Sequence, residues 1–203
     1  MQIGVLSIQG DVAENIAAAE NALTKLDESG TVKTVKTPQE IDTVDGLIIP
    51  GGESTMMGQL SLVNGALKKI KEKIETGMPV LGICAGLILL SKGAKDRIVG
   101  KTDQPLLDIL DVQVERNSFG RQKESFEAEI SMDSCGIPKL NGVFIRAPSI
   151  SHTGPGVDTL SKLNGKIIAV KQGNILATAF HPELTQDTSL YMHFIDMIKS
   201  HTV

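Results

Sequence analysis

Continuous apolar runs and helical periodicities alternate along the first half of the chain. Residues 1–8, 46–50 and 78–83 are near-continuous apolar runs, which are typical of parallel strands buried on both faces. Apolar residues at helical spacing follow in residues 12–27 and in a stretch that ends near Glu75. This order predicts a doubly wound α/β sheet with right-handed crossovers, in which ligands bind beyond the carboxyl ends of the strands.

Residues between these segments predict where the helices begin and end and where further short elements lie. Asp11 precedes the first helical pattern and Glu14 follows three residues later, which predicts a capping box. Residues 31–36 alternate Thr, Val and Lys, and we expect a short strand near a sheet edge. Residues 38–41 are expected to form a helical turn, and the helical stretch before Glu75 is expected to break near residues 64–65.

The pattern changes after Gly93. Apolar and polar residues alternate there, which predicts antiparallel strands with one solvent-exposed face. The expected strands are residues 112–116, 125–130 and 142–148, a hairpin of 167–170 and 175–180, and then a terminal helix over 189–199. The predicted fold is therefore a doubly wound, mixed, mostly parallel sheet with flanking helices and antiparallel strands in the C-terminal half. We expect one domain over residues 1–203.

The composition and charge of the chain argue against several functional classes. The chain has 203 residues, a formal net charge of −4 and no basic run, so it lacks the electrostatic signature of a nucleic-acid-binding protein. No apolar run approaches the ~20 residues of a membrane span, and the first residues do not resemble a signal peptide. Two cysteines without metal-ligand spacing favour a reducing compartment, and we expect a cytoplasmic protein with no metal.

The most distinctive stretch surrounds Cys84. An apolar run ends in Gly-x-Cys-x-Gly, and a second apolar run over residues 87–90 follows at once. This layout predicts a strand, a sharp turn and a buried helix, with the thiol at the turn, as in a nucleophile elbow. The N–H groups of a helix N-terminus favour a thiolate and an oxyanion beside it. The alternative, that Cys84 is a small apolar core residue, stays open on this stretch alone.

A candidate base follows another apolar strand, in His181-Pro182-Glu183. In an extended segment residues i and i+2 point to the same side, so the Glu183 carboxylate can orient the His181 ring toward a thiol. A loop histidine beside a surface glutamate is the alternative. The elbow cysteine and the glycine pair Gly51-Gly52 at a neighbouring strand end favour the catalytic interpretation.

The remaining polar residues are expected to be structural or solvated. This group contains His152, His193, His201, Cys135, Glu127 and Glu129.

Gly82-Ile83-Cys84-Ala85-Gly86 with the distant His181-Pro182-Glu183 resembles the class I, triad-type glutamine amidotransferases. Within them, further blocks resemble the glutaminase subunits of pyridoxal 5′-phosphate synthase. These blocks are residues 51–55, 114–122, 125–127, 144–148 and 180–185. The resemblance runs from the first strand to the terminal helix, and is weakest at residues 31–37, 94–103 and 132–140.

The resemblance implies that the chain hydrolyses L-glutamine to L-glutamate and ammonia. It implies a partner, a (β/α)8-barrel synthase subunit that receives the ammonia through a tunnel and makes the coenzyme. The coenzyme is then a product of the complex, and no cofactor is expected for this chain.

The resemblance also implies roles for individual residues. Cys84 would be the nucleophile, His181 the proton shuttle and Glu183 the group that orients it. The residues implied to contact substrate are Gly51, Gly52, Glu53, Arg116, Ile145 and Arg146. We expect the oxyanion to be held by the backbone N–H groups of Gly52 and Ala85.

Two other functions remain open from the sequence. The first is a cysteine hydrolase like the DJ-1/PfpI group, which also places a cysteine at an elbow. The second is a non-catalytic glutaminase-like subunit that only binds its partner.

Overall fold

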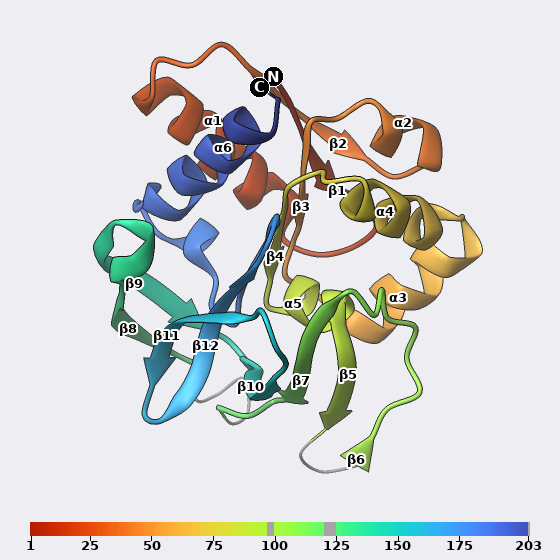
Figure 1. Cartoon of the computed structure of the whole chain (residues 1–203), viewed down its shortest axis with the longest axis vertical. Helices are drawn as coiled ribbons and strands as arrows, with labels where there is room; N and C mark the ends of the chain where they lie inside the picture. The colour runs from red at the N-terminus through yellow and green to blue at the C-terminus, as the bar shows by residue number, and fades with distance from the viewer. Residues whose placement is uncertain (97–99, 120–124, 203) are drawn as a thin grey trace.

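The computed structural model describes residues 1–96, 100–119 and 125–202. An eleven-stranded sheet runs through the molecule, with helices on both of its faces (Figure 1). The strand order is β2-β1-β3-β4-β13-β12-β10-β7-β5-β6, and β11 pairs with β12. A separate two-stranded sheet pairs β8 with β9. The predicted fold class, a mixed sheet with flanking helices and antiparallel strands in the C-terminal half, is confirmed.

The first half of the sheet is parallel. It contains β1 (Gln2–Leu6), β2 (Thr31–Val35), β3 (Gly46–Ile49), β4 (Val80–Ile83) and β13 (Ile175–Thr178). The strand β2 lies at the edge, as its alternating pattern predicts. Because β1 is flanked by β2 on one side and β3 on the other, the order reverses there, and the carboxyl ends of β1, β3 and β4 meet at one edge of the sheet.

Six helices cover this parallel half. They are α1 (Val12–Lys25), α2 (Pro38–Asp42), α3 (Ser54–Val63), α4 (Ala66–Glu75), α5 (Ala85–Leu90) and α6 (Ser189–Thr202). Figure 1 shows α1 and α6 side by side on one side of β1, β3 and β4, and α2 to α5 on the other. The predicted break at residues 64–65 is the junction of α3 and α4, where Gly65 has a φ of +80°. No helix among the described residues is long and apolar enough to cross a membrane.

The predicted capping box at Asp11 is wrong. Asp11 is the N-cap of α1, but its side chain makes no capping hydrogen bond. The motif occurs instead at α2, where the Thr37 hydroxyl accepts from the Glu40 N–H at 3.3 Å and the Glu40 carboxylate accepts from the Thr37 N–H at 2.9 Å. The Asp11 carboxylate lies toward His181, a partner that the sequence pattern does not reveal.

The second half of the sheet is mainly antiparallel. It contains β5 (Ser91–Asp96), β6 (Gly100–Lys101), β7 (Leu110–Arg116), β10 (Ser149–Thr153), β11 (Asp158–Leu163) and β12 (Lys166–Gln172). The predicted hairpin is confirmed, because Gln172 pairs with Ile175 across a two-residue turn. The strand β7 pairs antiparallel with β10 but parallel with β5, so the prediction of purely antiparallel strands is only partly right.

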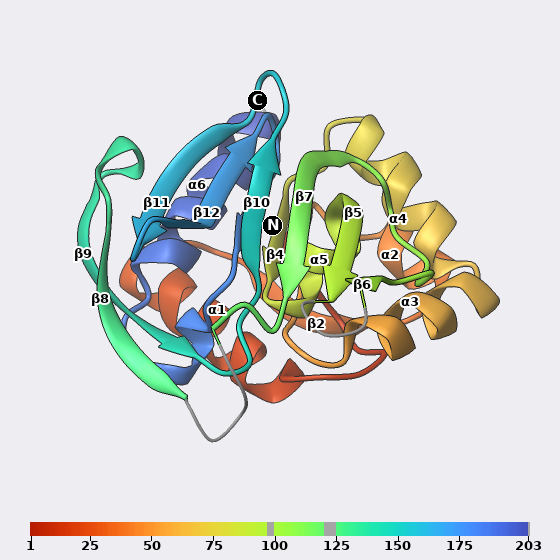
Figure 2. The same ribbon diagram turned by 90° about the horizontal axis from the view of Figure 1, so that it is seen from below.

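The strands β5, β6, β10 and β11 were not predicted from the sequence, because their short patterns give little periodicity. The strand expected at residues 142–148 was predicted to begin and to end too late in the chain. The strand β9 (Ile137–Phe144) pairs with β8 (Phe126–Met132) and ends before the expected boundary. The chain turns at Arg146, which has a φ of +49°. Figure 2 shows β8 and β9 curving along the outside of the molecule beside β11.

Candidate active site

Cys84 occupies the turn between β4 and α5. It has φ +49° and ψ −95°, a backbone conformation that side-chain-bearing residues rarely adopt, and it is the N-cap of α5. Its N–H donates to the Thr178 carbonyl of β13 at 2.8 Å, which fixes the turn to the neighbouring strand. The side chain is nearly buried. The predicted strand, turn and helix around Cys84 are therefore confirmed.

Close packing requires glycine on both sides of Cys84, at Gly82 and Gly86. A Cβ atom on Gly86 would lie 2.2 Å from the Ile49 carbonyl oxygen, and one on Gly82 would lie 2.4 Å from a methyl group of Leu90. Only glycine at these positions lets α5 approach β3 and fold back over β4. The Gly-x-Cys-x-Gly pattern thus encodes close packing around a strained cysteine.

His181 follows β13 and is tied to β9 by its N–H, which donates to the Val143 carbonyl at 2.8 Å. Its Nδ1 lies 2.7 Å from Glu183 Oε1, and the Glu183 side chain is completely buried. The contact between ring and carboxylate agrees with the prediction. The geometry differs from it, because Pro182–Leu184 is a 3₁₀ turn rather than an extended segment.

Three groups surround the His181 ring. Burial lowers the pKa of His181, but hydrogen bonds to Cys84 and Glu183 outweigh it and raise this pKa to about 11. Asp11 Oδ2 lies 3.5 Å from the same Nδ1 that contacts Glu183. The ring is therefore an imidazolium at neutral pH, with the Cys84 sulfur on one side and two carboxylates on the other.

Asp11, His181 and Glu183 each offer a ligand atom within 4.8 Å of the others, which is the spacing of a metal site. However, the 2.7 Å separation of His181 Nδ1 and Glu183 Oε1 is a direct hydrogen bond. We therefore interpret the three residues as a hydrogen-bonded cluster around the base.

A cavity of about 390 Å³ opens beside Cys84 and His181. Clefts of this size hold small molecules. It is lined by Gln9, Asp11, Gly52, Glu53, Ser54, Cys84, Ile88, Arg116, Asn117, Ile145, Arg146, His181 and Leu184. Five of the six residues implied to contact substrate are in this lining. The sixth, Gly51, is buried against the base, where a Cβ would lie 2.4 Å from His181 Cε1.

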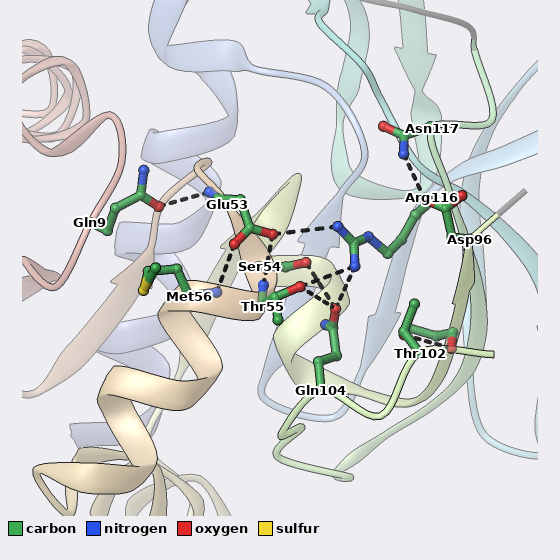
Figure 3. Close-up of polar contacts among 11 residues, drawn as sticks. Gln9, Glu53, Ser54, Thr55, Met56, Asp96, Thr102, Gln104, Arg116 and Asn117 are labelled. Atoms are coloured by element: carbon green, nitrogen blue, oxygen red, sulfur yellow. Dashed lines mark hydrogen bonds and ion pairs between the residues drawn. The ribbon is translucent and has the colours of Figure 1, made fainter. Parts of the chain in front are cut away.

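Opposite charges face each other at one wall of the cavity (Figure 3). Arg116 Nη2 lies 3.4 Å from Glu53 Oε1. Glu53 is the N-cap of α3 and accepts from the Met56 N–H at 2.8 Å and the Thr55 N–H at 3.0 Å. Partial burial raises the pKa of Glu53, but the hydrogen bonds and the charge of Arg116 lower it by more than burial raises it. The pKa is therefore below its usual value, and the carboxylate stays ionised at neutral pH. An anion and a cation in one small cavity suit a zwitterion such as a free amino acid.

The two predicted oxyanion donors come from neighbouring turns. Ala85 is the first residue of α5, and Gly52 belongs to the turn between β3 and α3. Gln9 supports that turn, because its Oε1 accepts from the Glu53 N–H at 2.7 Å (Figure 3). The pairing of Gly52 and Ala85 as oxyanion donors stays a prediction.

Several polar residues of the site were given no role from the sequence. Asp11 and Asn117 line the cavity, and Gln104 lies behind Arg116. Asp11 lies at the end of the turn between β1 and α1, at the edge where ligands bind, and this position is a signal that could have placed it beside the cavity, although not against His181. Gln104 lies between strands without periodicity, and its sequence context offers no comparable signal.

The residues set aside in the sequence lie elsewhere. None of His152, His193, His201 and Cys135 lines this cavity. Glu127 and Glu129 are exposed on β8 and contact Asn141 and Lys139 of β9, as expected for a solvated strand face. His201 belongs to the last turn of α6. Residues 120–122 of the block at 114–122 lie outside the described residues.

The fold and the site together define a class. This is a doubly wound α/β protein with an elbow cysteine and a histidine–glutamate pair at the carboxyl edge of its sheet. The model of the SNO glutamine amidotransferase family matches residues 5–200, and the chain belongs to this family.

Relatives and solved structures agree with this assignment. The chain is 60% identical to pyridoxal 5′-phosphate synthase subunit PdxT of Nitrosopumilus maritimus, over 98% of this chain and 97% of the relative. It is 44% identical to the protein of the same name from Saccharolobus islandicus, over 98% and 100%. A crystal structure of a glutamine amidotransferase has a TM-score of 0.85 at 39% identity, over 97% of this chain and 98% of that chain. A glutamine amidotransferase of Thermotoga maritima, with a TM-score of 0.62 at 12% identity, shares the fold.

Proposed function

We propose that this chain is a single glutaminase domain that hydrolyses L-glutamine and supplies the ammonia to a pyridoxal 5′-phosphate synthase subunit. One observation carries the proposal: His181 is hydrogen-bonded to both Cys84 and Glu183 at the wall of a cavity that also presents Glu53 and Arg116. The names of the curated relatives support the glutaminase assignment and the place in vitamin B6 biosynthesis.

The charged wall of the cavity suits the backbone end of glutamine. The Glu53 carboxylate would pair with the α-ammonium group, and the Arg116 guanidinium with the α-carboxylate, for which its fork of N–H donors is well matched. Gly52, Ile145 and Arg146 line the same space. Gly51 would act indirectly, because its missing side chain leaves room for the His181 ring.

In the first half of the reaction, the Cys84 thiolate attacks the side-chain carbonyl carbon of glutamine. The developing oxyanion would be stabilised by the N–H groups of Gly52 and Ala85. The His181 imidazolium donates its proton to the leaving nitrogen as the C–N bond breaks, which releases ammonia and leaves a thioester on Cys84. The raised pKa of His181 supplies this proton at neutral pH.

In the second half, neutral His181 accepts a proton from water, and the water oxygen attacks the thioester carbonyl. The C–S bond then breaks, and glutamate leaves with Cys84 restored as a thiolate beside an imidazolium. Glu183 holds the ring in place and stabilises its charged form throughout. No step of this sequence requires a cofactor.

An exposed apolar surface lies next to the site. It is formed by Met56, Leu60, Leu62 and Val63 of α3, the helix that begins at the Ser54 wall of the cavity. Such a surface supports contact with a partner protein. We propose that the (β/α)8-barrel synthase subunit binds on this side and receives the ammonia. Because Cys84 acts only as a free thiol, we also propose a cytoplasmic location.

The test is glutamate and ammonia release from L-glutamine, measured with and without the cognate synthase subunit. The wild-type chain should release both products with the partner, while Cys84→Ala should lose turnover by at least ~10³-fold and still bind the partner, because only the nucleophile is removed. Cys135→Ala is the matched control and should keep full activity. Full turnover by Cys84→Ala would contradict the mechanism. Peptide or glyoxal turnover without glutamine turnover would favour a DJ-1/PfpI-like hydrolase, and partner binding without any turnover would favour a non-catalytic subunit.

A further inference from the structure

Gln104 lies behind the charged wall of the cavity without lining it. It belongs to the segment between β6 and β7, which packs tightly between two helices. The Leu107 N–H donates to the Leu89 carbonyl of α5 at 2.7 Å. On the other side, a Cβ on Gly58 of α3 would lie 2.5 Å from the Pro105 carbonyl oxygen. Gln104 is itself 8% exposed. Its side chain is therefore held in a fixed position.

The Gln104 carbonyl oxygen gathers three donors (Figure 3). It accepts from Arg116 Nη1 at 2.8 Å, from Thr55 Oγ1 at 3.2 Å and from Ser54 Oγ at 3.3 Å. Since a guanidinium can only donate, the Gln104 atom that faces Arg116 has to be the oxygen. One amide oxygen thus connects β7, which carries Arg116, to the first turn of α3.

These contacts occupy the Nη1 end of the guanidinium, and the Nη2 end pairs with Glu53 at 3.4 Å. Arg116 Nη1 donates to Gln104 and also to Thr55 Oγ1 at 3.2 Å. Nη2 lies on the side of Glu53, toward the cavity. The arrangement fixes the plane of the guanidinium before any ligand arrives, which reduces the entropy lost when a carboxylate binds.

We propose that Gln104 is a positioning residue for substrate recognition: it holds Arg116 so that the Nη2 edge of the guanidinium, beside Glu53, meets the α-carboxylate of glutamine. This inference rests on the proposed glutaminase function. A neutral acceptor suits the task, because a carboxylate in its place would be a second anion beside Arg116, in addition to Glu53, and would compete with the substrate carboxylate. An aliphatic side chain would leave the guanidinium free to move.

The test is steady-state glutaminase kinetics of Gln104→Met in the complex with the synthase subunit. Methionine has a similar size but no strong acceptor. KM for L-glutamine should rise roughly tenfold, with kcat within about threefold, because a lost hydrogen bond to a charged group weakens binding and leaves Cys84 and His181 in place. Gln39→Met makes the same substitution at an exposed glutamine of α2, away from the cavity and from α3; it is the matched control and should change neither constant.

A double-mutant cycle separates positioning from a merely structural role. If Gln104 acts through Arg116, then Gln104→Met should raise KM little further in an Arg116→Ala background. Gln104→Glu keeps the shape and the acceptor, so it tests the idea even if Gln104→Met unfolds. Its carboxylate should also raise KM by competing for Arg116.

An unchanged KM in folded Gln104→Met and Gln104→Glu would overturn the inference, as would fully additive effects in the cycle. These results would leave the proposed function standing. Absence of glutamine turnover by the wild-type complex would instead overturn the proposed function, and the inference with it.

Discussion

The groups around the imidazole ring of His181 determine its protonation state. His181 has Glu183 at 2.7 Å and Asp11 at 3.5 Å from the same nitrogen, with Cys84 as a further hydrogen-bond partner. A histidine without such neighbours has a pKa near 6.5. The folded pKa of about 11 means that the charged form stabilises the fold fully below about pH 6.5, and that this contribution is lost as the pH rises toward 11.

Asp11→Asn should lower the pKa of His181, because it removes a negative charge close to the imidazolium. Asp11 is 40% exposed, so solvent screens the effect, and we expect a shift of roughly half a unit to one unit. The alkaline loss of kcat/KM should then begin at lower pH. The Asp11 side chain makes no capping hydrogen bond, so its replacement by Asn removes none from α1.

The measurement is the pH profile of glutamine turnover, together with ¹⁵N NMR titration of His181 in a Cys84→Ala background. Glu14→Gln, which removes an exposed charge from the same helix turn, is the control. Equal shifts in both variants would mean that Asp11 acts only through the general charge of the helix end.

At the scale of elements, the elbow depends on how closely α5 approaches the sheet. Gly86 faces the Ile49 carbonyl of β3, and the backbone there has no room to move without breaking strand pairing. Gly93 is also crowded. A Cβ there would lie 2.2 Å from the amide end of the Gln113 side chain, and would meet no backbone atom at that distance. A Cβ would come equally close to a neighbouring atom at both positions, but that atom is backbone at Gly86 and a flexible side chain at Gly93.

Gly86→Ala should therefore destabilise the protein by about 2–3 kcal/mol and displace Cys84, with a large loss of kcat. Gly93→Ala should cost less than about 1 kcal/mol, because a flexible side chain can move aside. Urea unfolding and glutamine turnover of both variants provide the check. Equal costs at the two positions would contradict the packing argument.

The first and the last helix of the chain, α1 and α6, pack against each other. Between them, the buried Tyr191 hydroxyl donates to Asn15 Oδ1 at 2.8 Å. Asn15 in turn donates to the Asp11 carbonyl at 2.7 Å. The C-terminal helix therefore supports the turn that carries Asp11, although the two segments lie at opposite ends of the sequence.

Tyr191→Phe should cost about 1–3 kcal/mol in the free energy of unfolding, because it leaves the Asn15 oxygen buried without a donor. Glutamine turnover at 25 °C should remain close to that of the wild type. Asn15→Ala should also destabilise, and the double variant should lose less than the sum, since both changes remove one shared hydrogen bond. Additive losses in urea unfolding would show that the bond carries no energy.

The sequence by itself determined the strands β1 to β4 of the parallel half and the candidate residues of the site, but not the parallel pairing of β13 with β4. Buried strands form apolar runs, and the Gly-x-Cys-x-Gly and His-Pro-Glu patterns are local, so these patterns together with the family resemblance pointed to Cys84, His181 and Glu183. The sequence-based prediction erred where local patterns are weak, as at β5, β10 and β11, and where a residue had a distant partner. Asp11 has the sequence of a helix cap, yet its carboxylate faces His181.

Only the tertiary structure decided which polar groups meet. Gln104 and Arg116 lie on different segments, and the contact between them depends on how β7, α3 and α5 pack against one another. A hydrogen bond between segments leaves no periodicity in either of them. The sequence therefore indicated Cys84 and His181 as the candidate nucleophile and base, and the packing of the sheet and helices determined how the cavity beside them is held in shape.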